Sequence, residues 1–202
     1  MPRNATSKSS TKSSSRSTAR GAAKGSSQDV LHLLAEDHKR VLKMFEEFEE
    51  LKEENSEDEE TMQQLVEIAC AELTIHAQLE EELFYPAARE AIDDMDLLDE
   101  AEVEHAAARQ LITELAAMQP GDDLYEAKFT VLGEYVKHHI QEEEKELFPK
   151  VKKSDLDLME LAEEIRERKM ELRDELGVMP DEEDAEDEND PSSRSQTRKN
   201  IH

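Results

Sequence analysis

The sequence of 202 residues has no tryptophan, a single cysteine, five glycines and six prolines. One cysteine, Cys70, can build neither an intramolecular disulfide framework nor a cysteine-rich zinc site. No run approaches the ~18 consecutive apolar residues that a transmembrane helix needs, and no apolar stretch near the N-terminus indicates secretion. These absences argue against disulfide-stapled and membrane-spanning proteins, and a cytoplasmic location without a membrane partner is expected.

Positive charge is scarce as well. The chain has 25 Lys and Arg against 52 Asp and Glu, so its formal net charge is -27. A protein that binds duplex nucleic acid neutralises phosphates with basic side chains, and this balance argues against a nucleic-acid partner. The excess acid by itself is compatible with disorder, with a solvated surface or with cation handling.

Charge and residue type divide the chain into four segments. Residues 1–28 carry six basic residues, no acid and many serines, and are expected to be a disordered tail because they cannot bury enough apolar surface. Residues 179–202, with eight acids between positions 181 and 190, are expected to be a second, acidic and polar disordered tail. Between them we expect a bundle domain over residues 29–150 and a helix packed on it over residues 151–178.

Apolar residues recur at spacings of three and four and do not alternate with polar residues as they would in a strand. This periodicity predicts five helices, over about residues 29–51, 56–85, 96–118, 122–149 and 154–176. Ser56 begins a Ser-x-x-Glu capping box, Asp122 follows a Pro-Gly break as an N-cap, and Gly177 stands where a C-cap glycine belongs. The predicted fold class is all-α, an antiparallel four-helix bundle with a fifth C-terminal helix and disordered tails.

Each of the first four predicted helices carries one histidine on its apolar stripe: His38, His76, His105 and His139. Glu80 and Glu143 each follow a histidine by four residues, a spacing that places both side chains on one face of a helix. A buried carboxylate is costly without a positive partner, and no Lys or Arg lies near these levels of the inward faces. Protons or metal ions are left to balance the charge, and imidazole with carboxylate is a ligand set for iron, manganese or zinc.

A single core histidine is more often hydrogen-bonded to a carboxylate than bound to a metal. Here, however, residues 76–86 align without gaps on residues 139–149, and the histidine, the glutamine, two glutamates and the proline recur at an offset of 63. The domain therefore has the sequence of a duplicated helix pair, in which each half supplies one lone histidine and one His-x-x-x-Glu pair. Two such halves related by a two-fold axis would make a two-metal site.

This series of motifs resembles the hemerythrin-like, HHE cation-binding domain family over about residues 29–150. The resemblance implies a centre of two non-haem iron ions with open positions for dioxygen or a small anion; manganese or zinc would be less expected there. It implies that the metal residues are His38, His76, Glu80, His105, His139 and Glu143, with the glutamates bridging the two ions.

One departure concerns the third helix. Respiratory hemerythrins carry a further histidine one turn after the third-helix histidine, and here that position is Arg109, which puts reversible oxygen carriage in doubt. Glu102 precedes His105 by three residues, a spacing used in di-iron carboxylate bundles, but is interpreted as an exposed acid. We interpret Tyr135, one turn before His139, as a core residue; the alternative is a hydrogen-bond donor to a bound oxygen species. His138 is interpreted as part of a solvent face.

The expected function is that of a non-haem di-iron protein that binds, senses or scavenges oxygen or a related small oxidant, with binding favoured over catalysis. Two alternatives stay open: a di-iron oxidase or peroxide-consuming enzyme, and a metal-free helical module whose acidic surface docks basic partners. Metal ions and a small oxygen species are the expected partners, and the sequence indicates no particular protein partner.

Overall fold

The computed structural model describes residues 28–53 and 58–178, and all regular structure within them is helical. The α-helices within these residues are α1 (Val30–Glu53), α2 (Glu59–Leu79), α3 (Tyr85–Ala91), α4 (Met95–Leu115), α5 (Tyr125–Glu142), α6 (Phe148–Val151) and α7 (Leu158–Leu176). Two π-helical turns, η1 (Glu80–Phe84) and η2 (Glu143–Leu147), join α2 to α3 and α5 to α6 without a break. Both expected tails lie outside the described residues, apart from Gln28.

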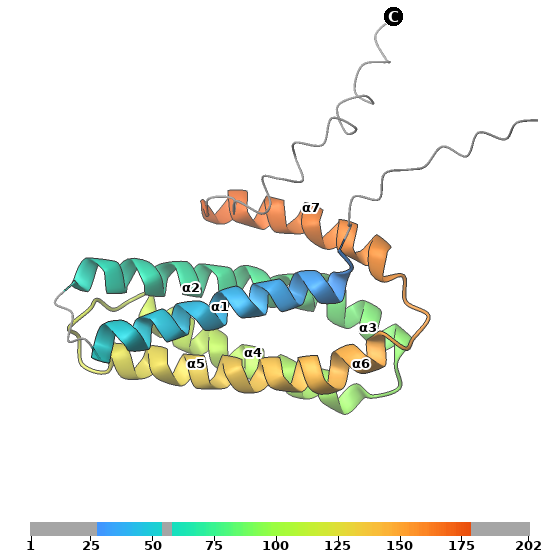
Figure 1. Cartoon of the computed structure of the whole chain (residues 1–202), viewed down its shortest axis with the longest axis horizontal. Coiled ribbons are helices and arrows are strands. Elements are labelled where there is room, and N and C mark those ends of the chain that lie inside the picture. Colours follow the sequence, from blue (N-terminus) through green and yellow to red (C-terminus); the bar gives the residue numbers. More distant parts are fainter. Residues whose placement is uncertain (1–27, 54–57, 179–202) are drawn as a thin grey trace, which may run out of the picture.

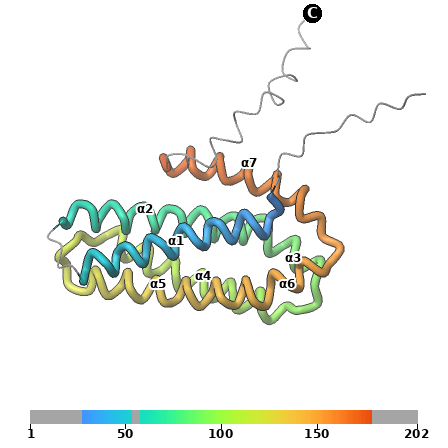
Figure 2. Tube along the Cα trace, in the orientation of Figure 1, coloured from blue at the N-terminus to red at the C-terminus, as the bar shows by residue number. Residues whose placement is uncertain are grey.

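The long helices α1, α2, α4 and α5 lie side by side along the long axis of the molecule, and α3 and α6 continue α2 and α5 (Figure 1). Their trace runs up and down between the two ends of the bundle (Figure 2). Helix α7 lies along the outside of the bundle, slightly tilted, where it contacts α1 and α2 (Figure 1). The predicted all-α fold, a four-helix bundle with a fifth long helix, is confirmed.

Two predicted N-caps can be compared with the helix ends of the structure. Helix α2 begins at Glu59, and Asp58 is its N-cap, because the Asp58 carboxylate accepts a hydrogen bond from the Thr61 amide at 3.0 Å. The cap predicted at Ser56 lies outside the described residues. Asp122 is not an N-cap: its side chain accepts from the Gln119 amide and closes a turn, and α5 begins only at Tyr125.

The C-terminal helix ends as predicted but starts later. Gly177 follows α7 with φ +67°, the left-handed conformation in which a side chain is strained, so the glycine terminates the helix. The start falls at Leu158 rather than near residue 154, because the Asp157 side chain caps the amides of Met159 and Glu160.

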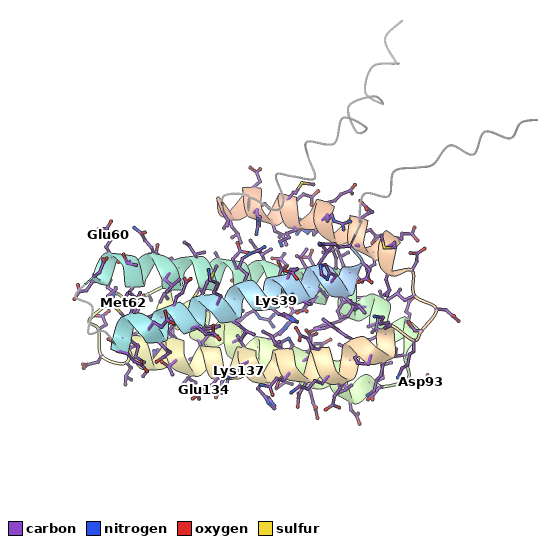
Figure 3. The ribbon with its side chains drawn as sticks, in the orientation of Figure 1. Lys39, Glu60, Met62, Asp93, Glu134 and Lys137 are labelled. Atoms are coloured by element: carbon purple, nitrogen blue, oxygen red, sulfur yellow. The ribbon has the colours of Figure 1, made fainter. Side chains whose placement is uncertain are left out.

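Two groups of buried apolar side chains fill the bundle, one at each end. One contains Leu34, Phe84 and Ile165, and so includes residues of α7; the other contains Val41 and Phe129. Burying each such side chain contributes about 1.5–3 kcal/mol. Charged residues such as Glu60, Asp93 and Glu134 point outward (Figure 3). None of the described helices is long and apolar enough to cross a membrane.

Candidate metal centre

Four histidines meet in the middle of the bundle, between the two apolar groups. His38 comes from α1, His76 from α2, His105 from α4 and His139 from α5, and each is at most 6% exposed. The Nε2 atoms of His38 and His76 lie 3.1 Å apart, and those of His105 and His139 lie 3.2 Å apart. The centre therefore holds two pairs of imidazoles with their Nε2 atoms turned inward.

Glu80 lies between the two imidazole pairs and is completely buried. Its Oε1 is 3.2 Å from His76 Nε2, and its Oε2 is 3.3 Å from His105 Nε2. The two oxygens of this carboxylate thus face different pairs, which is the arrangement that a bridging carboxylate needs.

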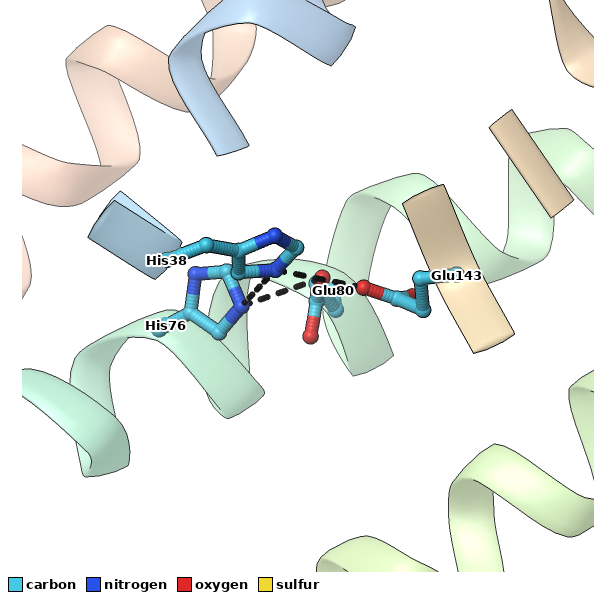
Figure 4. Close-up of side chains that lie close together, drawn as sticks. All are labelled: His38, His76, Glu80 and Glu143. Carbon is cyan, nitrogen blue, oxygen red and sulfur yellow. Dashed lines mark hydrogen bonds and ion pairs between the residues drawn. The ribbon is translucent and has the colours of Figure 1, made fainter. Parts of the chain in front are cut away.

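Glu143 has the matching position in the second half of the chain and is 2% exposed. Its Oε2 lies 3.3 Å from His38 Nε2 and 3.6 Å from His139 Nε2, so it too reaches both pairs. Figure 4 shows His38 and His76 turned toward Glu80 and Glu143. The structure therefore brings together all six residues that the sequence singled out; their role as metal ligands stays a prediction.

The chemistry of these atoms fits a cation. Among the residues that the structure describes, Glu80 Oε1 and Glu143 Oε2 are buried without a hydrogen-bond partner, although imidazole nitrogens stand close by. Such atoms are costly in an apolar core. Ligands held by bonds of ~2.1 Å at right angles lie ~3 Å from one another, and these N–N and N–O spacings are close to that value.

The charges of the centre depend on one another. Burial by itself would lower the pKa of His76, but Glu80 and Asp37 outweigh it and raise that pKa to about 10. Burial would raise the pKa of Glu80, yet His76 and His105 hold it well below its usual range. Protons on imidazole thus balance the carboxylates in the metal-free protein, and a bound cation would displace them.

Each of the four histidines also faces an acid through Nδ1, on the side away from the centre. Asp37 Oδ2 lies 3.7 Å from His76 Nδ1; the other three pairs are hydrogen-bonded, His38–Glu144 at 3.0 Å, His105–Glu81 at 3.0 Å and His139–Glu104 at 2.9 Å. Such outer partners fix the tautomer and the direction of a ligating imidazole.

These four acids were not predicted from the sequence. Their positions in the sequence could have indicated them, because each acid is adjacent to a central residue. Asp37 and Glu104 precede lone histidines, and Glu81 and Glu144 follow the central glutamates. Lying beside a central residue, each acid reaches the histidine of a neighbouring helix rather than the centre itself.

The π-helical turns begin at the two central glutamates. The Tyr85 amide donates to the Glu80 carbonyl and the Phe148 amide to the Glu143 carbonyl, five residues back in each case. Single π turns inside α-helices are rare and occur mostly at functional sites. The π-helical turns were not predicted from the sequence. The feature that could have indicated them is a proline at matching places in the two helices, because proline cannot donate the amide hydrogen bond that an α-helix requires there.

Tyr85 is a further residue of the centre, and it was not predicted from the sequence. It is 1% exposed, and its hydroxyl donates a hydrogen bond to Glu143 Oε1 at 2.9 Å. Burial, with Glu143 and Glu80 close by, raises the pKa of this phenol well above its usual value. The alignment of the two halves contained the signal, because it sets Tyr85 against Phe148 in otherwise matching segments.

Comparison with known proteins identifies the family to which this chain belongs. The model of the hemerythrin HHE cation binding domain matches residues 29–151. The chain belongs to this family. A solved structure of a hemerythrin HHE cation binding domain-containing protein from Mycobacterium kansasii is similar in fold, with a TM-score of 0.61 and 24% sequence identity over 73% of this chain and 89% of that one.

A curated relative from Nostoc sp. (strain PCC 7120), named DNA nickase, is 27% identical over 125 residues. The match covers 62% of this chain but only 33% of that protein. The chain therefore spans about a third of the length of this relative.

Two residues near this HHE centre do not face it. Glu102 pairs with Arg89 at 2.8 Å, and its side chain is 55% exposed, which confirms the prediction that it is an exposed acid. The guanidinium of Arg109 pairs with Glu81, beside the centre rather than in it. Neither side chain places a potential metal-ligand atom among the four histidines.

Two further predictions concern the surface near the HHE centre. Tyr135 is 47% exposed, so its assignment to the core was wrong: it sits one turn before His139 but on the rim of the helix face. His138 lies on a solvent face as predicted, with 65% of its side chain exposed, and stands 3.4 Å from Glu142 and 3.6 Å from Glu104.

A small cavity adjoins the four histidines. Its volume is about 30 Å³, and Glu104, Arg109 and Tyr135 also border it. That is room for one or two molecules of the size of water. Most of its wall is apolar, formed by Val41, Leu73, Ala108, Ile112, Val136 and Ile140.

Proposed function

We propose that the protein binds two non-haem iron ions between its four central histidines and uses them to bind, sense or scavenge dioxygen or a related small oxidant. The observation that carries the proposal is the pair of buried carboxylates, Glu80 and Glu143, each of which reaches both imidazole pairs. In this proposal His38 and His76 hold one ion, and His105 and His139 hold the other.

The donor set supports iron among the possible cations. The family description specifies only a cation. Imidazole suits iron and zinc, whereas manganese prefers carboxylate and water, and here four imidazoles accompany two carboxylates. Carboxylates shared between paired metal sites are typical of di-iron helical bundles. When bound, the irons supply electrons and an open coordination position.

The protein's own residues supply position and selectivity. The acids on Nδ1, such as Glu104 and Glu144, hold the imidazoles with Nε2 inward. The apolar wall of the adjoining cavity favours a small uncharged molecule over a hydrated ion. The layers of buried apolar residues on either side keep bulk water from the centre.

Iron content and an optical spectrum test the proposal together. Purified protein reconstituted with ferrous iron should hold two irons per chain, and azide should change the visible spectrum of its ferric form. A Glu80→Ala/Glu143→Ala variant should lose the iron, whereas Glu102→Ala, which removes an exposed acid, should retain it. Absence of iron from the wild type, or unchanged iron in the double variant, would refute the proposal.

The same protein distinguishes the alternative functions. Consumption of peroxide that is lost in His76→Ala and His139→Ala would indicate an enzyme, while an azide-sensitive spectrum without turnover indicates a binding or sensing protein. A metal-free interaction module requires that chelation leaves the melting temperature unchanged, and we expect chelation to lower it.

The absence of a nucleic-acid partner stays a prediction. The nickase name belongs to a relative of which this chain matches a third, and the net charge of -27 opposes binding to duplex DNA. We expect no nicking of supercoiled plasmid by the iron-loaded chain; nicking that the Glu80→Ala/Glu143→Ala variant lacks would contradict this. A cytoplasmic location is likewise a prediction.

A further inference from the structure

The two halves of the centre match in their histidines and glutamates but differ in one aromatic residue. On the side of His38 the aromatic ring is Phe148, stacked on the imidazole at 5.8 Å with an angle of 9° between the planes. On the side of His105 it is Tyr85, whose ring centroid lies 5.5 Å from the imidazole. These aromatic residues occupy equivalent positions of the repeat, so only one half has an oxygen there.

The Tyr85 oxygen lies among atoms that belong to the centre. It is 2.9 Å from Glu143 Oε1, 3.4 Å from Glu80 Oε2 and 3.4 Å from His105 Nε2. Ligands around one ion with bonds of ~2.1 Å at right angles are ~3 Å apart. The phenol oxygen therefore has, within a few tenths of an ångström, the spacing of a ligand neighbouring His105 and Glu80.

Neither lone histidine is followed one turn later by a second ligand residue. Leu42 follows His38, and His105 is followed by Arg109, whose guanidinium cannot coordinate a cation and pairs with Glu81. Tyr85 supplies an oxygen on this side from a different element, at the junction of η1 and α3.

We propose that Tyr85 is a metal ligand through its phenol oxygen, bound to the ion that His105 and His139 hold, so that the two metal positions differ chemically. This inference rests on the proposed iron centre. On binding, the O–H bond breaks, the proton leaves to solvent, and the oxygen–iron contact replaces the hydrogen bond to Glu143. The charge of the ion offsets the repulsion between the phenolate and the neighbouring carboxylates.

The competing role for Tyr85 is that of a hydrogen-bond donor that only orients Glu143. The two roles differ in spectrum, because a phenolate bound to ferric iron absorbs visible light and shows its ring vibrations in resonance Raman, whereas a hydrogen-bonded phenol does neither. Light absorption by the bound phenolate thus reports coordination directly, without reference to activity.

Tyr125 and Tyr135, the other two of the three tyrosines in the chain, provide matched controls for Tyr85. Metal-free wild type and the variants Tyr85→Phe, Tyr125→Phe and Tyr135→Phe are loaded with ferrous iron without air and oxidised with ferricyanide. We expect tyrosinate ring modes in the wild type and in both controls, and complete loss of these modes in Tyr85→Phe with iron still bound to the His38 side.

The wild-type spectrum is decisive even where Tyr85→Phe fails to fold. Iron bound to the wild type without tyrosinate modes overturns this inference and leaves the proposed function standing. Modes that persist in folded Tyr85→Phe overturn it as well. Failure of the wild type to bind iron refutes the proposed function, and this inference with it.

Discussion

His139 Nδ1 lies 2.9 Å from Glu104 Oε2, on the opposite side of the imidazole from the centre. The contact keeps Nε2 directed inward and raises the electron density that the imidazole offers to a cation. Together with the three other acid–imidazole contacts, it holds four histidines on separate helices in the orientation that the proposed metal ligands require.

Replacing this acid tests its role. Glu104→Gln keeps the shape of the side chain but removes the charge, and we expect metal affinity to fall by about 10–100-fold. Glu142→Gln is the control, because it removes the same charge from the neighbouring surface group around His138. Competition with a chelator of known affinity measures both variants, and equal affinities for the two would contradict the role of Glu104.

The pKa shifts predict how pH affects the metal-free protein. His76 has a pKa of about 10 against 6.5 for free histidine, so its contribution to stability is full below pH 6.5 and is lost as pH rises toward 10. Glu80 has a lowered pKa, so its contribution is present above pH 4.5 and is lost on acidification. The free energy of unfolding of the metal-free protein should therefore fall between pH 6.5 and 10.

Metal binding should show the opposite trend over the same range, because the cation must displace the proton on His76. Denaturant unfolding of chelated protein and metal titrations, each at several pH values in that range, measure the two trends. His76→Gln is the control variant and should flatten the pH dependence of unfolding. A metal-free protein that becomes more stable toward pH 10 would contradict the assignment.

Helix α7 is connected to the centre through a partly buried ion pair. Lys169 Nζ lies 2.6 Å from Asp37 Oδ1, and Asp37, which faces His76, is only 6% exposed. Lys169→Met should lower the free energy of unfolding by about 2 kcal/mol, because Asp37 loses its shortest contact to a basic group and keeps only the longer ones to Arg40 and His76. Denaturant unfolding measures the loss. Lys153→Met, an exposed control, should change stability little, and equal losses in the two variants would refute this coupling.

Leu124 provides a test of the backbone alone. It precedes α5 with φ +73°, a conformation that costs a residue with a Cβ about 1–2 kcal/mol, and its side chain is 67% exposed. Leu124→Gly should raise the free energy of unfolding by about 1 kcal/mol, whereas Leu124→Ala should bring no such gain. Thermal or denaturant unfolding measures both, and a stability loss in Leu124→Gly would show that packing of the leucine outweighs its backbone strain.

The bundle and the six central residues were predictable because they depend on periodicity. His38, His76, His105 and His139 each continue an apolar stripe, and an acid one turn after a histidine on that stripe must point into the same core. A duplicated segment made the pattern specific. The helix ends at Glu59 and Tyr125 were missed because several polar residues there compete for the role of cap.

The contacts of Tyr85 and of the acids on Nδ1 could not be predicted from the residue spacing within a single helix. Glu81 and Glu144 follow the central glutamates and would face away from the centre on a regular helix face, but they contact histidines of other helices across the π-helical turns. Their role depends on how helices pair in space, which spacing within one helix does not contain. Tyr85 required a comparison of the two halves for differences rather than for matches.

The account is tested most directly by anomalous diffraction at the iron edge from crystals of the iron-loaded protein. It predicts two iron peaks in the centre, one beside the Nε2 atoms of His38 and His76 and one beside those of His105 and His139, with Glu80 and Glu143 shared between them. The result that would contradict it is no peak among these six residues, or iron bound only at the surface group of Glu104, His138 and Glu142.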